Sequence, residues 1–167
     1  MYWGGKSRGG KRGRGAPGKS PFVAALSRNT KGHPVQIRLS RVKAFSSESV
    51  KDWADHHLYP KSIVISDGLG CFRSFDDCGH IHGAIITGDS RNPDKIKPFI
   101  WLITTIGNVK NSIRGTYHGV SKKHLSLYLG EFSFRFNRRF NLGQMVPALI
   151  SFAVNSKPIP QHQLRLA

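Results

Sequence analysis

The heptapeptide Ser62-Ile63-Val64-Ile65-Ser66-Asp67-Gly68 indicates the fold class of this chain. Its run of β-branched residues predicts a short buried strand, and the Asp-Gly pair predicts that the strand ends there. A carboxylate directly after a buried strand projects from a rigid sheet edge, where open α/β sheets hold ligands and metals. An ordinary turn gives the same pair, so this pattern alone leaves Asp67 open between a turn and a site.

Strands and helices alternate around this heptapeptide. The apolar spacing has a period of two before it and a helical period in the C-terminal half. This order predicts an α/β domain over residues 21–157, with a mixed sheet flanked by helices, followed by a tail at 158–167. In the second strand, Val35, Ile37 and Leu39 are expected to share one face. The expected elements are strands at 22–26 and 34–42 joined by a hairpin at 30–32, a helix capped by Ser46 or Ser47 and stopped by Pro60, strands at 62–66 and 81–87, and helices at 99–113, 121–136 and 145–156, the last closing the domain.

Basic residues dominate the charge of the chain. Its 26 Lys and Arg against 9 Asp and Glu give a net charge of +17 and a pI of about 10.6. Residues 1–19 contribute +6 of this total and residues 110–167 contribute +8. A near-neutral body with two basic ends predicts a polyanion partner, most commonly nucleic acid. No apolar run could span a membrane and no secretory signal is visible, so we expect a cytoplasmic, nucleoid-associated protein.

The first twenty residues read as a separate basic arm or loop. Residues 4–19 are rich in Gly and Arg and lack any large apolar side chain that could anchor a core. A solvated linker and a loop that follows a phosphate backbone both fit this composition, and the density of positive charge favours the second. The candidate DNA contacts in this arm are Lys6, Arg8, Lys11, Arg12 and Arg14.

Two cysteines give little information. Cys71 and Cys78 precede His80 and His82 in the spacing C-x6-C-x-H-x-H, which is not a recognised zinc pattern. We therefore expect two partly buried thiols.

Several longer motifs combine basic, aromatic and amide residues in a pattern that core packing alone would not select. They are Tyr2–Lys6, Ser66–Gly68, Gly107–Lys110, Arg114–His118 and Glu131–Arg139. Together they resemble bacterial insertion-sequence transposases of the ISXO-like branch, which carry a DDE-type catalytic domain. The similarity runs from about residue 2 to residue 149. It implies a ribonuclease-H-like fold and DNA transposition, in which transposon-end phosphodiesters are cleaved and strands are transferred to target DNA with two Mg²⁺ (or Mn²⁺) ions.

The resemblance assigns catalytic candidates residue by residue. Asp67 matches the second catalytic aspartate. Asn108 matches the third position in a subgroup that carries asparagine there and a lysine downstream, here Lys110. Asp67 and Asn108 would then be the metal ligands, although an amide oxygen binds Mg²⁺ more weakly than a carboxylate does. An exposed helical amide is the alternative for Asn108, and a phosphate contact is the favoured role for Lys110.

The same motifs supply further candidates for contacts to backbone phosphates. A solvated helix face is the alternative for each of them. Tyr117 and His118 could stack on a base, but holding the junction between two helices is the favoured interpretation. The candidates are Arg114, Arg135, Arg138 and Arg139.

One part of the family pattern has no counterpart here. The family's first catalytic aspartate comes before the element that Tyr2 matches, where this chain has only Met1. We therefore expect an incomplete first strand, marginal stability and a fragment that binds DNA without cleaving it. The competing hypothesis is a non-catalytic, basic nucleic-acid-binding protein. A homo-oligomer is compatible with either.

Overall fold

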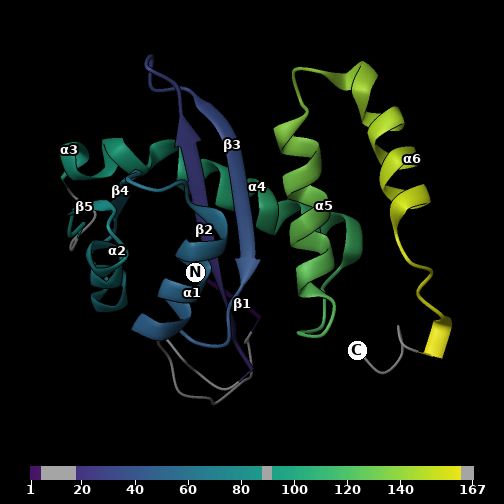
Figure 1. The fold of residues 1–167 in the computed structure, drawn as a ribbon, viewed down its shortest axis with the longest axis horizontal. Coiled ribbons are helices and arrows are strands. Elements are labelled where there is room, and N and C mark those ends of the chain that lie inside the picture. Colours follow the sequence, from purple (N-terminus) through teal and green to yellow (C-terminus); the bar gives the residue numbers. More distant parts are fainter. Residues whose placement is uncertain (5–17, 88–91, 163–167) are drawn as a thin grey trace.

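The computed structural model describes residues 1–4, 18–87 and 92–162 (Figure 1). Its first sheet is antiparallel, in the order β1-β2-β3, and is made of β1 (Tyr2–Trp3), β2 (Ser20–Arg28) and β3 (Pro34–Arg41). Phe22 lies opposite Arg41 and Leu26 lies opposite Ile37. The predicted hairpin is confirmed, because Gly32 takes a left-handed φ of +81° and donates its N–H to Asn29.

The second sheet has two parallel strands, β4 (Ile63–Ser66) and β5 (Ile81–Ala84). Ile63 lies opposite Ile81 and Ser66 lies opposite Ala84. The turn η1 (Gly70–Arg73) and the short helix α2 (Ser74–Asp77) connect the two strands. A strand therefore forms where one was predicted after Ser62, and it ends at the residue before Asp67. The prediction that it is buried is wrong, because Ile63 is 76 % and Ile65 is 42 % exposed on this two-stranded sheet.

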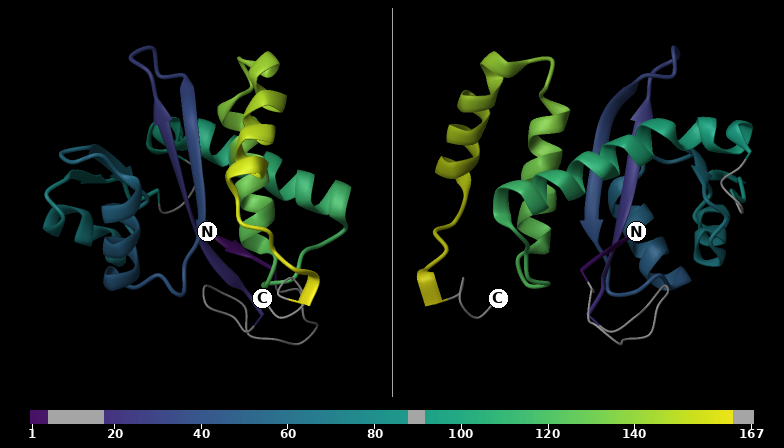
Figure 2. Two further views of the ribbon diagram at one scale, coloured as in Figure 1. Left: turned by 45° about the vertical axis from the view of Figure 1, so that its right-hand side comes forward. Right: turned by 180° about the vertical axis from the view of Figure 1, so that it is seen from behind.

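Helices cover both faces of the first sheet. In Figures 1 and 2, α1 lies on one face of the strands and the long helix α4 crosses the other. Ser46 caps α1, as predicted, by accepting a hydrogen bond from the N–H of Ser49 (3.2 Å). The remaining bounds are α1 (Ser47–His57), α3 (Pro93–Ile96), η2 (Lys97–Phe99), α4 (Ile100–Tyr117), α5 (Leu125–Asn137), η3 (Leu142–Gln144) and α6 (Met145–Asn155).

The core is divided by β2, whose successive side chains point to opposite faces. Phe22 is fully buried among residues of β3, α4 and α5, whereas Val23 packs with Val50 and Trp53 of α1. This layered arrangement is a mixed α/β fold with small sheets flanked by helices, consistent with the ribonuclease-H-like class predicted from sequence.

Strands β2 and β4 are not paired with each other. An open hollow of about 1670 Å³ lies between them, lined by residues 23–28 of β2 and 63–66 of β4, with α1 and α4 also contributing; we refer to it as the β2–β4 hollow. Met1 exchanges two backbone hydrogen bonds with Phe22 (2.8 and 3.0 Å). Beyond that pair, no described strand borders this edge of β2. Strand β1 itself is two residues long.

Two further packing predictions are wrong. Val35 is 43 % exposed although Ile37 and Leu39 on the same strand face are buried, because it lies near the hairpin end of β3. Helix α6 forms where a helix was predicted, but none of its residues is buried, so it does not close the domain. Its few polar groups and lack of burial leave an apolar surface exposed.

Candidate catalytic edge and nucleic-acid interface

Asp67 lies directly after β4, exposed, and lines the β2–β4 hollow. Its Oδ1 accepts a hydrogen bond from the N–H of Leu69 (3.3 Å), which is the local contact of an Asx turn. The turn and the site interpretations of Asp67 are therefore compatible. The turn fixes the carboxylate at the strand end while its remaining acceptor positions point to an accessible space.

A hydrogen-bonded network supports this strand end. The Oγ of Ser66 lies 2.8 Å from Nε2 of His82 on β5, and Nδ1 of His82 lies 3.4 Å from Oδ2 of Asp76. The imidazole is 4 % exposed and the Asp76 carboxylate is 57 % exposed. Ser66 Oγ also accepts the N–H of Gly68 (3.3 Å). These bonds tie the two parallel strands together next to Asp67 and hold its backbone in place.

Gly68 is required by the backbone itself. Its φ of +77° is left-handed, and a Cβ at this position would lie 2.8 Å from Cγ1 of Ile86. Both facts explain why glycine follows Asp67.

Asn108 and Lys110 lie in the middle of α4 and are not joined to Asp67 by a hydrogen bond. Ile103 and Ile106 of this helix line the β2–β4 hollow, whereas Asn108 is exposed and is not among the lining residues. Two residues after Ile106, its side chain is turned by about 200° around the helix. Lys110 is half-buried, with Nζ 3.9 Å from the sulfur of Met1.

The described residues do not fit a two-metal centre. Such a site needs several oxygen ligands around each ion. Asp67 supplies one carboxylate, Asp76 is engaged with His82, and the described ranges contain no group of three His, Cys, Asp or Glu residues that could hold a metal. The Cys71, Cys78, His80 and His82 set likewise forms no such group.

A comparison with protein families decides the assignment of the chain. The model of the ISXO2-like transposase domain matches residues 1–137. The chain belongs to this family. No curated protein and no solved structure is similar enough to count as a match. The predicted resemblance is confirmed, and membership gives DNA transposition as the broad function and DNA as the general partner; DDE-type transposases generally use divalent metal ions.

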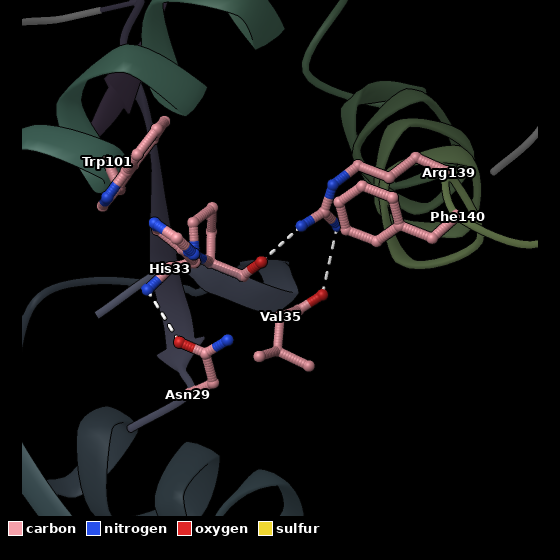
Figure 3. A pocket seen from close by; sticks show the side chains of 7 residues that line it. Asn29, His33, Val35, Trp101, Arg139 and Phe140 are labelled. Atoms are coloured by element: carbon pink, nitrogen blue, oxygen red, sulfur yellow. Dashed lines mark hydrogen bonds between the residues drawn. The ribbon is translucent and has the colours of Figure 1, made fainter. Parts of the chain in front are cut away.

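The end of the family match holds a structural clamp that sequence reasoning missed. Asn137 Oδ1 accepts the N–H of Ile37 (2.7 Å), and Asn137 Nδ2 donates to the carbonyl of the same residue (3.0 Å). Arg139 donates from Nη1 to the carbonyl of Val35 (3.1 Å) and from Nη2 to that of Pro34 (Figure 3). Together they fasten the end of α5 to β3.

Arg139 therefore has a structural role, and its predicted phosphate contact stays a prediction. Its guanidinium also stacks on Phe136 and Phe140, with centroid distances of 3.9 and 4.3 Å. Burial lowers the pKa of Arg139 from its ordinary value. It lies beside a separate hollow of about 520 Å³ that none of the predicted catalytic residues lines.

The other predicted arginines differ in their surroundings. Arg114 is exposed on α4, with its guanidinium 5.9 Å from the ring centre of Trp3. Arg135 pairs with Glu131 (3.4 Å), and Arg138 lies over Phe134 at 4.1 Å. All three remain candidates for phosphate contacts. The predicted arm residues Lys6, Arg8, Lys11, Arg12 and Arg14 lie outside the described residues.

Tyr117 lies where α4 and α5 meet, at the helix junction that the favoured interpretation of this residue predicted. The hydroxyl of Tyr117 donates to Oε2 of Glu131 (2.8 Å), and its ring packs edge-on against Tyr128 at 4.4 Å. His118 ends α4 with a left-handed φ of +53°.

Two arginines that line the same hollow as Asp67 were not singled out by the sequence. Arg28 of β2 and Arg38 of β3 are exposed and line the β2–β4 hollow together with Asp67 and Arg138. Neither Arg28 nor Arg38 forms an ion pair within the described part of the chain. The outward positions of β-strands are polar in most proteins, so only the fold reveals that these two share a hollow with the candidate carboxylate.

Proposed function

We propose that this chain is a fragment of a transposase catalytic domain that binds DNA along the β2–β4 hollow and does not cleave it. The observation that carries the proposal is the set of arginines, Arg28, Arg38 and Arg138, lining the same hollow as Asp67. Guanidinium groups bind phosphates through forked donors, and their charge attracts the backbone from a distance.

The expected lack of cleavage rests on the ligand set of the described residues. Two-metal phosphodiester chemistry stabilises both the attacking and the leaving oxygen, and Asp67 belongs to no group of three possible metal ligands within the described ranges. If a divalent ion binds this domain, Asp67 would hold it, and Asn108 stays a proposed weaker ligand. The ion would polarise a phosphate oxygen.

The experiment is a pair of assays on the purified 167-residue chain. Fluorescence anisotropy with a labelled duplex measures affinity, and a nicked-product assay in Mg²⁺ or Mn²⁺ measures cleavage. We expect binding without cleavage. Asp67→Asn removes a negative charge beside the phosphates and should tighten binding by about two- to fivefold.

The matched control is Glu48→Gln, which changes the net charge equally at a residue that does not line the hollow. Metal-dependent cleavage by the wild-type chain that is lost in Asp67→Asn would refute the proposal that the chain does not cleave DNA. An equal change in DNA affinity in Asp67→Asn and Glu48→Gln would refute the proposal that DNA binds in the β2–β4 hollow.

A further inference from the structure

Helix α6 carries an apolar surface that the described part of the chain does not cover. None of its residues is buried, and Val146, Leu149, Ile150 and Val154 are 62, 52, 59 and 78 % exposed. These four residues lie on one side of the helix, as the spacings of three and four residues require; we refer to them as the α6 patch. The family match ends at residue 137, before this helix begins.

The opposite side of α6 makes the few contacts with α5. The ring of Phe152 packs edge-on against Phe134 with centroids 6.3 Å apart, and the guanidinium of Arg138 lies 5.9 Å from Phe152. Figures 1 and 2 show α6 as the outermost helix, beside α5 and away from the sheets. The contact with α5 therefore orients the α6 patch outward.

The chemistry of this segment argues against two classes of partner. Residues 140–156 form the longest stretch of the chain without Asp, Glu, Lys or Arg, so the segment offers no cationic side chain to DNA phosphates. A helix that lies on a membrane surface carries Lys and Arg on its polar side, which α6 lacks. No helix in the described ranges is long and apolar enough to cross a membrane.

We propose that the α6 patch is an interface between two copies of this chain. Two molecules with a net charge of +17 repel each other over most of their surfaces. The charge-free α6 surface is where they can approach with least repulsion. A two-fold pair needs only one self-complementary stripe, which these four residues provide.

The available area fits a weak dimer. At roughly 100 Å² of exposed surface each, the four residues of the α6 patch offer about 400 Å² per copy, compared with about 800 Å² in a standard interface. Phe140 and Leu142, in the segment before α6, are also exposed and add to the apolar area. This inference does not depend on the proposed function.

Sedimentation equilibrium of the nuclease-treated full chain tests the interface. We expect a concentration-dependent shift from 18.6 kDa towards twice that mass. Raising the NaCl concentration should strengthen the association, because salt screens the repulsion and leaves the apolar contact intact. Association through residual nucleic acid would weaken instead, and that result would overturn the proposal.

Two substitutions locate the contact. Leu149→Glu and Ile150→Glu, each checked for folding by circular dichroism, should weaken the dimer at least about tenfold by burying a charge. Tyr59→Glu places the same charge at a highly exposed residue after α1 and should leave the dimer unchanged. A wild-type chain that stays monomeric would mean that another protein or segment covers α6. That result, or a folded Leu149→Glu or Ile150→Glu variant that still dimerises, would overturn the proposal.

Discussion

The side-chain amide of Asn137 forms two hydrogen bonds with the backbone of Ile37, the same pair that a neighbouring β-strand would form. Its amide accepts the N–H of Ile37 at 2.7 Å and donates to the carbonyl at 3.0 Å. Ile37 is 2 % exposed and lies on the outer strand of the sheet. The amide side chain thus satisfies an otherwise unpaired edge and joins α5 to β3.

Replacing Asn137 should destabilise the domain. Asn137→Ala leaves the N–H and C=O of a buried residue without partners, which costs about 2–4 kcal/mol. Asn137→Asp keeps the acceptor and loses the donor, so its cost should be intermediate. Urea denaturation measures both, with the exposed Asn111→Ala of α4 as control. A loss below that of the control would show that the amide is not a clamp.

Arg139→Lys separates clamping from DNA binding. The charge is retained, but one ammonium cannot reach the carbonyls of Pro34, Val35 and Phe136 together, so stability should fall by about 1–2 kcal/mol. DNA affinity should change no more than in Arg135→Lys. Weaker DNA binding without loss of stability would instead assign Arg139 to phosphate contact.

The neighbouring residues His56 and His57 should make opposite contributions to the pH dependence of folding stability. Burial lowers the pKa of His57, so the unfolded chain takes up this proton more readily than the folded chain does. Folding stability therefore falls as the pH drops below about 6.5. The backbone carbonyl of Asp52, 2.7 Å from Nδ1, raises the pKa of His56. The stability that His56 contributes is therefore present below about pH 6.5 and lost as the pH rises.

Urea midpoints at pH values of about 5.5 and 7.5 check both signs. Between these two pH values, the His57→Gln variant should lose less folding stability on acidification than the wild type does. The His56→Gln variant should lose more. Equal responses from the two variants would contradict these assignments.

The edge of β2 that no described strand borders makes a prediction for hydrogen exchange. The backbone N–H and C=O groups of Phe22 face Met1, and along a strand these groups point alternately to the two sides. Those of Ala24 therefore face the β2–β4 hollow, and those of Val23 and Ala25 face β3. The amide of Ala24 should exchange much faster than its two neighbours in a nuclear magnetic resonance experiment. Equal protection of all three would mean that the hollow is filled in solution.

Local patterns were sufficient to predict most elements. The β-branched run before Asp67 and the Ser46 cap each depend on neighbouring residues, which is why the sequence located β4 and the start of α1. The roles of Asn137 and Arg139 depend on β3, about a hundred residues earlier, and local charge suggested DNA instead. The exposure of α6 was also unpredictable, because helical apolar spacing does not say whether a partner covers the helix.

The salt dependence of DNA binding tests the central claim most directly. Each phosphate contact contributes about 0.9 to the slope of log affinity against log salt. The double variant Arg28→Ala/Arg38→Ala should therefore lower the slope by about 2. The double variant Lys43→Ala/Lys95→Ala removes the same charge outside the β2–β4 hollow and should change the slope little. Equal slopes for wild type and the arginine variant, or no binding by the wild-type chain, would contradict a DNA-binding hollow beside Asp67.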